Sequence, residues 1–322
     1  MKYRKLGRTG FEVSGVGHGL WGMSGWSGSS DEESLAALQL AVDLGCNFYD
    51  TAWAYGEGKS DGLLGEITSR NPKKRLYAAS KIPPANDRWP ALPEYKYQDV
   101  FSPKHVFKYA DKIRKQLRTD TIDLLQFHVW DDSWTNEPDF RSTVEKLKHD
   151  GWIRYFGLSI NRWQAENGIK ALRTGLVDVV QVIYNIFDQS PEDELFPVCQ
   201  ELNVGVIARV PFDEGSLGGK MTIETRFPKD DWRSGYFGPE NLAKTIKRVD
   251  QLKEILPAGM TLPEMALRFI LSNPVVGTTI AGMRKLDHVR QNVASDSGPL
   301  DKALLAELKK HRWDRTPQRW SD

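Results

Sequence analysis

Four side chains that can bind or release a proton lie at or just beyond the ends of three short apolar runs. Asp50 follows the run Asn47–Tyr49, and Tyr55 lies five residues later in a loop rich in small residues. Lys81 follows Leu76–Ser80, and His128 follows Ile122–Phe127. If these runs are strands of a parallel (β/α)8 barrel, polar residues at their carboxyl ends converge on one rim.

Together these four groups could protonate an oxygen atom while hydride arrives on the carbon that bears it. A tyrosine with an ordinary pKa of ~10 is a poor proton donor at neutral pH. A neighbouring Lys81 ammonium stabilises the phenolate and lowers the pKa of Tyr55. Asp50 keeps Lys81 charged and fixed, and His128 can hydrogen-bond a substrate carbonyl oxygen. The set therefore predicts carbonyl reduction or the reverse oxidation.

Each of the four residues alone has a more common structural explanation. A loop tyrosine is usually structural, and a lysine after a strand is usually solvated. A histidine after an apolar strand is more often a buried core residue than a catalytic one, and an aspartate before a threonine commonly caps a turn. Their shared placement on consecutive strand ends is what favours the functional interpretation.

The chain alternates short apolar runs with polar loops and longer amphipathic stretches, which predicts parallel strands joined by crossover helices. Eight runs are strand candidates: Gly15–Gly17, Asn47–Tyr49, Leu76–Ala79, Ile122–Phe127, Tyr155–Leu158, Val179–Ile183, Val204–Ala208 and Thr278–Ala281. Before them, Tyr3–Leu6 and Phe11–Val13 are typical of a β-hairpin. The sequence thus predicts a single (β/α)8 (TIM) barrel domain over residues 1–322, with an N-terminal hairpin.

Helix boundaries are indicated by capping residues. Ser30 precedes Glu33 by three residues, as in a capping box, and Ser102 precedes a predicted helix over Lys104–Leu117. Prolines begin the stretches Pro239–Leu256 and Pro263–Leu271, and Asp301–His311 predicts an extra C-terminal helix. The long proline- and aromatic-rich segment Pro83–Val100 is predicted to be a lid or a binding mouth.

Composition excludes several function classes. The 44 basic and 43 acidic residues give a formal net charge of +1, which provides no general attraction to nucleic acid or an anionic membrane. No apolar stretch has the length of a membrane span, and the N-terminus lacks the apolar core of a signal peptide. Cys46 and Cys199 have no metal-ligand spacing and are predicted to be buried, reduced thiols. We expect a cytoplasmic protein without a metal site.

One motif in the sequence is misleading. Residues Gly17 to Gly22 spell GxGxxG, the fingerprint of a Rossmann dinucleotide site. That site requires a helix whose N-terminus holds the pyrophosphate. The residues after Gly22 are rich in glycine and serine, which favour turns. We therefore interpret these glycines as allowing the first barrel strand to end close to a ligand.

Several motifs resemble those of the aldo-keto reductase family. They are Asp50-Thr51-Ala52-Trp53-Ala54-Tyr55-Gly56-Glu57-Gly58-Lys59-Ser60-Asp61, Ala79-Ser80-Lys81, Ile122–His128 and Arg154–Ser159, in the order and spacing of that family. The similarity runs from the hairpin to about Asn292. It implies that Asp50, Tyr55, Lys81 and His128 form a catalytic tetrad, with Tyr55 as the acid in reduction. It also implies NADP(H) as the cofactor.

By similarity, the remaining strand ends form the cofactor pocket. Ser159, Asn161 and Gln181 would bind the carboxamide, the segment from Pro211 to Lys220 the pyrophosphate, and Arg284 the 2′-phosphate. The expected set is Gly19, Leu20, Trp21, Asp50, Ser159, Asn161, Gln181, Arg209, Val210, Pro211, Phe212, Asp213, Gly215, Leu217, Lys220, Arg226, Ala281, Gly282, Met283, Arg284, His288, Gln291 and Asn292.

Two of these positions depart from the family pattern. Arg209 stands where many relatives carry an aromatic residue that stacks on the nicotinamide. A guanidinium can also stack, but its charge interacts differently with the oxidised and reduced rings. Gln291 replaces a frequent glutamate near the adenine amine, which predicts looser binding of the adenine.

Tryptophan is abundant, with eleven in the chain. The expected substrate residues are Trp21, Trp53, Tyr55, His128 and Trp130, and Trp26, Trp89 and Trp134 also fall near the mouth loops. Such aromatic walls favour a small carbonyl or alcohol substrate, including sugar- or polyol-derived ones, although packing explains most single tryptophans. The tail from Trp313 is expected either to cover the mouth or to pack elsewhere.

The alternative function is a redox-sensing regulatory subunit, like the potassium-channel β-subunits of the same fold. It would retain its cofactor tightly and turn over slowly. The oligomeric state stays open.

Overall fold

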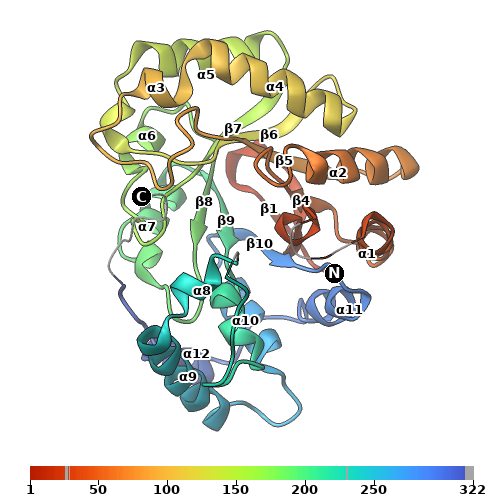
Figure 1. The fold of residues 1–322 in the computed structure, drawn as a ribbon, viewed down its shortest axis with the longest axis vertical. Coiled ribbons are helices and arrows are strands. Elements are labelled where there is room, and N and C mark those ends of the chain that lie inside the picture. The colour runs from red at the N-terminus through yellow and green to blue at the C-terminus, as the bar shows by residue number, and fades with distance from the viewer. Residues whose placement is uncertain (26–27, 29, 230, 316–322) are drawn as a thin grey trace.

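A closed barrel of parallel strands forms the centre of the molecule (Figure 1). The computed structural model describes residues 1–25, 28, 30–229 and 231–315. The barrel strands are β3 (Val16–Gly19), β4 (Phe48–Asp50), β5 (Tyr77–Ile82), β6 (Ile122–Phe127), β7 (Ile153–Ser159), β8 (Val179–Ile183), β9 (Gly205–Arg209) and β10 (Val276–Gly282). Each strand pairs in parallel with the next, and β10 closes onto β3. The predicted eight-stranded barrel is therefore confirmed.

Three strand ends differ from the predicted ones near the site. Pairing between β4 and β5 continues to Asp50 opposite Ala79, and pairing between β5 and β6 continues to Ile82 opposite Phe127. Asp50 is thus the last residue of β4 and Lys81 lies within β5, whereas the sequence predicts both just beyond their strands. An apolar sequence pattern stops at the first polar residue. The backbone hydrogen bonds between neighbouring strands can continue past that residue when its side chain points into the barrel. The first barrel strand begins at Val16 and extends to Gly19, past its predicted end.

Gly17 is required by close packing inside the barrel. A Cβ atom at this position would lie 2.9 Å from the Thr278 side-chain oxygen and 3.1 Å from the Phe48 ring. Gly22 lies within a 3₁₀ turn, Trp21–Met23, and the next helix among the described residues begins at Asp31. The GxGxxG motif is therefore not a Rossmann turn.

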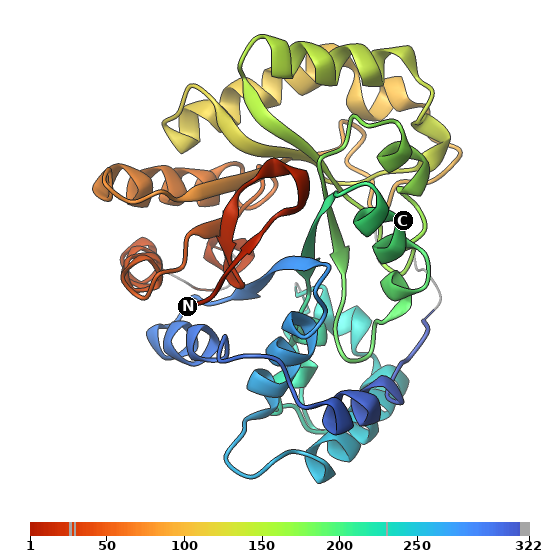
Figure 2. The ribbon, with the colours of Figure 1, turned by 180° about the vertical axis from the view of Figure 1, so that it is seen from behind.

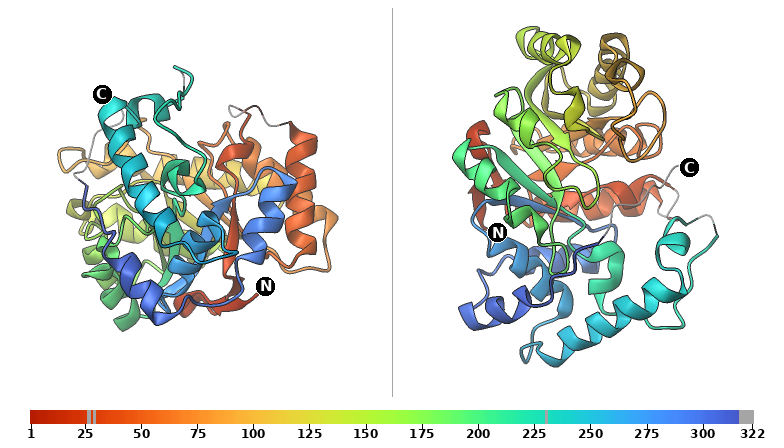
Figure 3. Two further views of the ribbon diagram at one scale, coloured as in Figure 1. Left: turned by 90° about the horizontal axis from the view of Figure 1, so that it is seen from below. Right: turned by 90° about the vertical axis from the view of Figure 1, so that its left-hand side faces the viewer.

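Helices surround the barrel. Along the longest axis of the molecule, α4 and α5 lie at one end and α9 and α12 at the other (Figures 1 and 3). They are α1 (Asp31–Asp43), α2 (Lys59–Arg70), α3 (Tyr97–Phe101), α4 (Pro103–Leu117), α5 (Pro138–His149), α6 (Ile169–Arg173), α7 (Leu195–Glu201), α8 (Arg233–Tyr236), α9 (Pro239–Glu254), α10 (Leu262–Leu271), α11 (Leu286–Ala294) and α12 (Lys302–Lys309).

The predicted helix starts agree with the observed caps. The Ser30 hydroxyl accepts from the Glu33 N–H, and the Glu33 carboxylate accepts from the Ser30 N–H, which completes the capping box. The Ser102 and Asp301 side chains each accept from backbone N–H groups in the first turn of α4 and α12, respectively, and so cap these helices. No helix within the described residues is long and apolar enough to cross a membrane.

The N-terminal hairpin closes the amino-terminal end of the barrel, as the view from behind shows (Figure 2). It consists of β1 (Tyr3–Lys5) and β2 (Glu12–Ser14), which pair antiparallel. Leu6, Phe11 and Val13 of this segment form a buried cluster with barrel residues that include Phe48 and Leu124. Burial of this apolar cap leaves the opposite, carboxyl-terminal rim as the open end.

Candidate active site

A buried ion pair lies at the carboxyl-terminal end of the barrel. The Lys81 Nζ atom donates to Asp50 Oδ1 over 2.5 Å and to the Thr51 carbonyl over 2.8 Å. Both side chains are almost completely buried. A buried charge is tolerated only when it is paired and hydrogen-bonded, so this pair fixes the Lys81 ammonium in one position.

Tyr55 and His128 lie beside this ion pair. The Lys81 Nζ atom is 5.2 Å from the centre of the Tyr55 ring, and the Tyr55 and His128 ring centres are 5.7 Å apart. The His128 Nδ1 atom is buried and has no hydrogen-bond partner among the described residues. The four residues predicted as a tetrad thus meet at one rim, although they come from separate strands and loops.

Burial sets the protonation states of Tyr55 and His128. Burial raises the pKa of the Tyr55 phenol, and this effect exceeds the lowering by the Lys81 ammonium. The Lys81 ammonium thus lowers the pKa of Tyr55 as predicted, but the larger effect of burial leaves that pKa above its ordinary value. Burial and then the charges of Lys81 and Arg209 hold the pKa of His128 well below its usual value. At neutral pH both groups are uncharged hydrogen-bond donors.

Two glutamine side chains hold the second oxygen of Asp50. The Gln181 amide donates to Asp50 Oδ2 over 2.7 Å, and the Gln126 amide donates to the same atom over 3.4 Å. Gln181 is predicted to bind the carboxamide of the cofactor, but its amide N–H is directed to Asp50 here. Gln126 was not singled out, because an inward polar residue inside an apolar run gives no sequence signal of its own.

Asp61 is a second buried carboxyl group near the ion pair. It accepts a hydrogen bond of 2.7 Å from the Ser80 hydroxyl. Burial raises the pKa of Asp61 to about 7. Asp61 is the last residue of the Asp50–Asp61 motif, and its position there predicts no role for it.

A cavity of about 180 Å³ opens next to the tetrad. It is lined by Tyr55, Trp89, Pro90, His128, Val129, Ser159, Ile160, Asn161, Arg162, Gln181 and Arg209. The Trp89 ring meets the His128 ring edge-on, with 4.5 Å between centres. The loop after β5 therefore reaches the mouth of the barrel, as predicted, although its last residues form α3.

Asn161 connects the barrel rim to this loop. Its amide donates to the Ala91 carbonyl over 2.9 Å, and its side-chain oxygen accepts from the Ala91 N–H over 3.2 Å. Asn161 is predicted to bind the carboxamide, and it does line the cavity. Its hydrogen bonds in this structure instead fix the position of the loop that carries Trp89.

Positive charge gathers on the neighbouring part of the rim, where the adenosine end of the cofactor is predicted. After burial, the charges of Lys220, Lys285 and Arg284 lower the pKa of His288, which places these cations around the start of α11. Lys220 follows β9 whereas the others follow β10, so the fold brings them together. His288 and Gln291 are exposed on α11, whereas Asn292 is buried.

Several predicted cofactor residues between Val210 and Arg226 make contacts within the protein. The backbone N–H groups of Gly215 and Leu217 both donate to the Phe212 carbonyl, so neither is directed outward. Leu217 is a core residue. The exposed Arg226 side chain donates to the Ile223 and Thr225 carbonyls of its own loop, and its contact with the phosphates stays a prediction.

The remaining predicted cofactor residues divide between core and rim. Leu20, Ala281 and Met283 are buried in the core, whereas Gly19 and Gly282 end β3 and β10, which pair with each other. Trp21 follows β3 and is 39% exposed. Val210, Pro211 and Phe212 follow β9 directly, and Val210 has a positive φ of 57°.

The tryptophans do not share one environment. Trp130, predicted as a substrate residue, is fully buried and packs against Trp134 and Phe140. It is a core residue because α5 covers it. Trp53 lies against Tyr109 of α4 rather than in the cavity. Trp26 lies outside the described residues.

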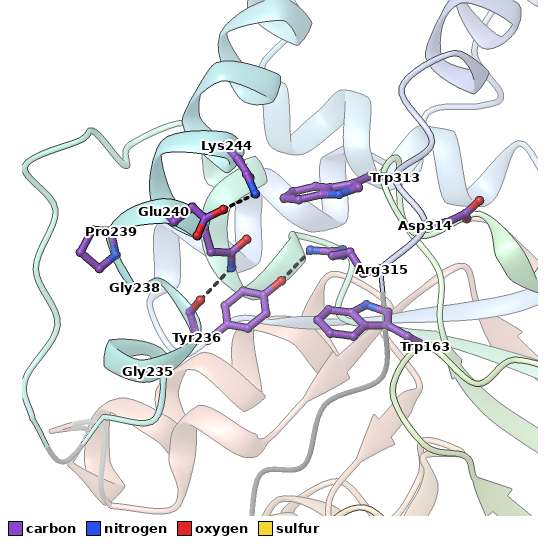
Figure 4. Close-up of a pocket in the computed structure, with 11 residues that line it drawn as sticks. Trp163, Gly235, Tyr236, Gly238, Pro239, Glu240, Lys244, Trp313, Asp314 and Arg315 are labelled. Carbon is purple, nitrogen blue, oxygen red and sulfur yellow. Dashed lines mark hydrogen bonds and ion pairs between the residues drawn. The ribbon is translucent and has the colours of Figure 1, made fainter.

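The C-terminal segment returns to the rim, where Arg315, the last residue that the structure describes, lies in a buried ionic cluster. Arg315 pairs with Asp188 Oδ2 at 2.5 Å and with Asp213 Oδ1 at 2.8 Å, and it donates to the Tyr236 hydroxyl at 2.6 Å. Its guanidinium carbon is 4.9 Å from each of the ring centres of Trp163 and Trp313, and Figure 4 shows the arginine between the two rings. Asp213, which is predicted to be a cofactor residue, therefore pairs with Arg315 of the C-terminal segment.

A wider cavity of about 530 Å³ adjoins this cluster, between α9 and the C-terminal segment (Figure 4). It contains none of the tetrad residues, so the smaller cavity is the one that adjoins the chemistry. Within the described residues no group of three or more histidine, cysteine, aspartate or glutamate side chains is arranged to hold a metal ion.

Comparisons with known proteins agree with this fold. Residues 15–312 match the model of the aldo/keto reductase family. The chain is 29% identical to the uncharacterized oxidoreductase YqkF of Bacillus subtilis over 97% of this chain and 96% of that protein. It is 26% identical to the NADH-specific methylglyoxal reductase of Escherichia coli, over 96% of this chain and 98% of that protein. Among solved structures, the glycerol dehydrogenase AKR11B4 of Gluconobacter oxydans matches with a TM-score of 0.77 and 26% identity over 98% of each chain.

The chain therefore belongs to the aldo/keto reductase family. This protein is an NADP-dependent oxidoreductase of that family, in contrast to its NADH-specific relative from Escherichia coli.

Proposed function

We propose that this protein reduces small aldehydes or ketones to alcohols with NADPH, and that Tyr55 is the general acid. The observation that supports this most directly is that Tyr55, His128 and the Lys81–Asp50 ion pair lie together beside one cavity. Buried ionisable groups that gather beside a cavity are typical of functional sites. The family's chemistry matches the chemistry that these groups can perform.

The residues divide the reaction between them. A carbonyl oxygen that enters the cavity can accept hydrogen bonds from the Tyr55 hydroxyl and the neutral His128 ring. The cofactor, when bound, supplies hydride to the carbonyl carbon. As negative charge grows on the oxygen, Tyr55 transfers its proton there, and the product is the alcohol. Lys81 then stabilises the phenolate, and Asp50 keeps Lys81 charged and in place.

The cationic part of the rim suits a phosphorylated dinucleotide. Lys220, Arg284 and Lys285 lie around His288, and a guanidinium can bind a phosphate with two parallel hydrogen bonds. We assign the 2′-phosphate to Arg284. Ser159, Asn161 and Gln181 line the cavity next to Tyr55 and are the candidates for the carboxamide.

The cavity favours a small substrate, and we propose a sugar- or polyol-derived carbonyl. Its volume is about 180 Å³, below the range of ~300–1,000 Å³ for drug-sized ligands. Trp89 and Pro90 give it an apolar wall, whereas Asn161 and Arg162 supply polar groups. The similarity to a glycerol dehydrogenase supports the same class.

The test is NADPH oxidation against a panel of small hydroxyaldehydes, hydroxyketones and aromatic aldehydes, with Tyr55→Phe as the inactive control. We expect turnover with one or more hydroxycarbonyl compounds. Tight NADPH binding without turnover on any member of the panel would instead support the redox-sensing subunit, and absence of NADPH binding would contradict both functions.

A further inference from the structure

Arg209 brings a positive charge into the cavity, and no carboxylate of the described residues pairs with it directly. It is the last residue of β9 and lines the cavity with Tyr55 and His128. One of its terminal nitrogens donates to the Ile160 carbonyl over 3.0 Å, and its Nε atom is buried without a partner. Among the residues that the structure describes, no aspartate or glutamate forms an ion pair with it.

The other charges around the cavity are already paired. Lys81 pairs with Asp50, and Arg162 pairs with Glu214. Glu214 and Asp50 also act on Arg209 at longer range, but each already pairs with another cation, so the described charges of the cavity leave one positive charge in excess. Burial lowers the pKa of Arg209 to about 10, so the guanidinium stays charged at neutral pH. Its charge also contributes to the lowered pKa of His128, which shows that its field reaches the tetrad.

We propose that Arg209 makes the protein bind the reduced nicotinamide cofactor more tightly than the oxidised one, and so favours carbonyl reduction over alcohol oxidation. This rests on the function proposed above. Hydride passes directly between the nicotinamide ring and the carbon of a carbonyl held by Tyr55 and His128, so the ring must enter this small cavity. The reduced ring is neutral, whereas the oxidised ring carries a positive charge that Arg209 repels.

The size of the effect follows from Coulomb's law. Two like charges several Å apart in a partly buried site repel strongly enough to change an equilibrium by about tenfold or more. An aromatic side chain at this position would stack on the ring without this repulsion. Arg209 would then act on the redox equilibrium of the bound cofactor, and not on proton transfer.

The experiment compares the dissociation constants of NADP⁺ and NADPH by quenching of tryptophan fluorescence. Arg209→Met removes the charge and keeps much of the side-chain length. Arg209→Gln also removes the charge but keeps a polar group, whereas Arg209→Lys keeps the charge. Arg173→Met is the control, because Arg173 lies exposed on α6. Circular dichroism identifies variants that fail to fold.

In the wild type we expect NADP⁺ to bind at least about tenfold more weakly than NADPH, an excess that like-charge repulsion in a partly buried site can produce. Arg209→Met and Arg209→Gln should lower this ratio by about tenfold, while Arg209→Lys and Arg173→Met leave it nearly unchanged. A wild-type ratio of one or less overturns the proposal without any variant.

Two further outcomes would also overturn the proposal. Equal weakening of both cofactor forms in Arg209→Met would mean that Arg209 anchors a part of the cofactor common to both. An unchanged ratio with a raised KM for anionic substrates would mean that it binds substrate. If the wild type binds neither cofactor, the proposed function itself fails, and this result is distinct from the other two.

Discussion

Lys81 donates a hydrogen bond to Asp50 inside the barrel, where neither side chain reaches solvent. The pair has additional partners on both sides, because Thr51 accepts from Lys81 and Gln181 donates to Asp50. Replacing one residue of a buried ion pair destabilises a fold more than replacing both, since the remaining charge then stays buried without a partner. The ammonium that supports Tyr55 therefore depends on Asp50.

Asp50→Asn should destabilise the fold by about 3–5 kcal/mol and lower carbonyl reduction, because Lys81 loses its counter-charge. The double variant Asp50→Asn with Lys81→Met should be more stable than Asp50→Asn alone, although it should be equally poor in catalysis. Urea unfolding and NADPH oxidation measure the two effects. Additive losses of stability in the double variant would contradict the coupling.

His128 should produce no inflection near pH 6.5 in the pH profile of kcat/KM for reduction. Since the pKa of His128 lies well below its usual value, the ring does not gain a proton as the pH falls through 6.5. Since the pKa of Tyr55 is raised, the phenol keeps its proton as the pH rises through the neutral range. We therefore expect neither Tyr55 nor His128 to change charge from roughly pH 6 to 9. Asp61, whose pKa is about 7, is the nearby group that titrates in this range, so Asp61→Asn is the control. A loss of activity with a midpoint near 6.5 that persists in Asp61→Asn would assign a charge change to His128 that this geometry opposes.

Arg315→Met should destabilise the protein by about 3–5 kcal/mol, because Asp188 and Asp213 would stay buried without their counter-charge. Arg312→Met is the matched control. Arg312 also pairs with an aspartate, Asp193, but that pair is exposed, and an exposed pair contributes about 0–1 kcal/mol. Urea unfolding of both variants gives the comparison. Equal losses would show that burial of the Arg315 cluster adds nothing.

Arg284→Ala should weaken NADPH binding much more than NADH binding. The two cofactors differ only at the 2′-phosphate, and a charge-assisted hydrogen bond to a phosphate is worth about 1.5–3 kcal/mol. Fluorescence titration with both cofactors measures the difference. Equal weakening of NADPH and NADH would remove the assignment of the 2′-phosphate to Arg284, and a wild type that prefers NADH would resemble its methylglyoxal reductase relative in this respect.

The sequence predicted the barrel because alternation of apolar runs with amphipathic stretches is a local pattern. The same pattern placed Asp50, Lys81 and His128 on successive strands, and parallel strands of a barrel have their carboxyl ends at one rim. It could not place the strand ends to the residue, so Lys81 lies inside β5 instead of beyond it. The hairpin was predicted from its turn and packs under the barrel through Leu6 and Phe11.

The side-chain partners of the site could not be predicted, because they depend on contacts between distant segments. Asn161 binds Ala91, seventy residues away, and Gln181 binds Asp50 across 131 residues. Trp130 is predicted to contact the substrate because it follows His128 closely, but the chain turns after His128 and buries Trp130 under α5. Arg315 gave no signal, since its aspartate partners follow two other strands.

The central claim is that the Tyr55 hydroxyl delivers the proton, and Tyr55→Phe tests it because only that oxygen is removed. Cofactor affinity, measured by fluorescence titration, should stay within about twofold of the wild type, while carbonyl reduction with NADPH should fall by ~10²–10⁴-fold, the usual contribution of general acid catalysis. A Tyr55→Phe variant that reduces the same carbonyl at the wild-type rate would contradict the account.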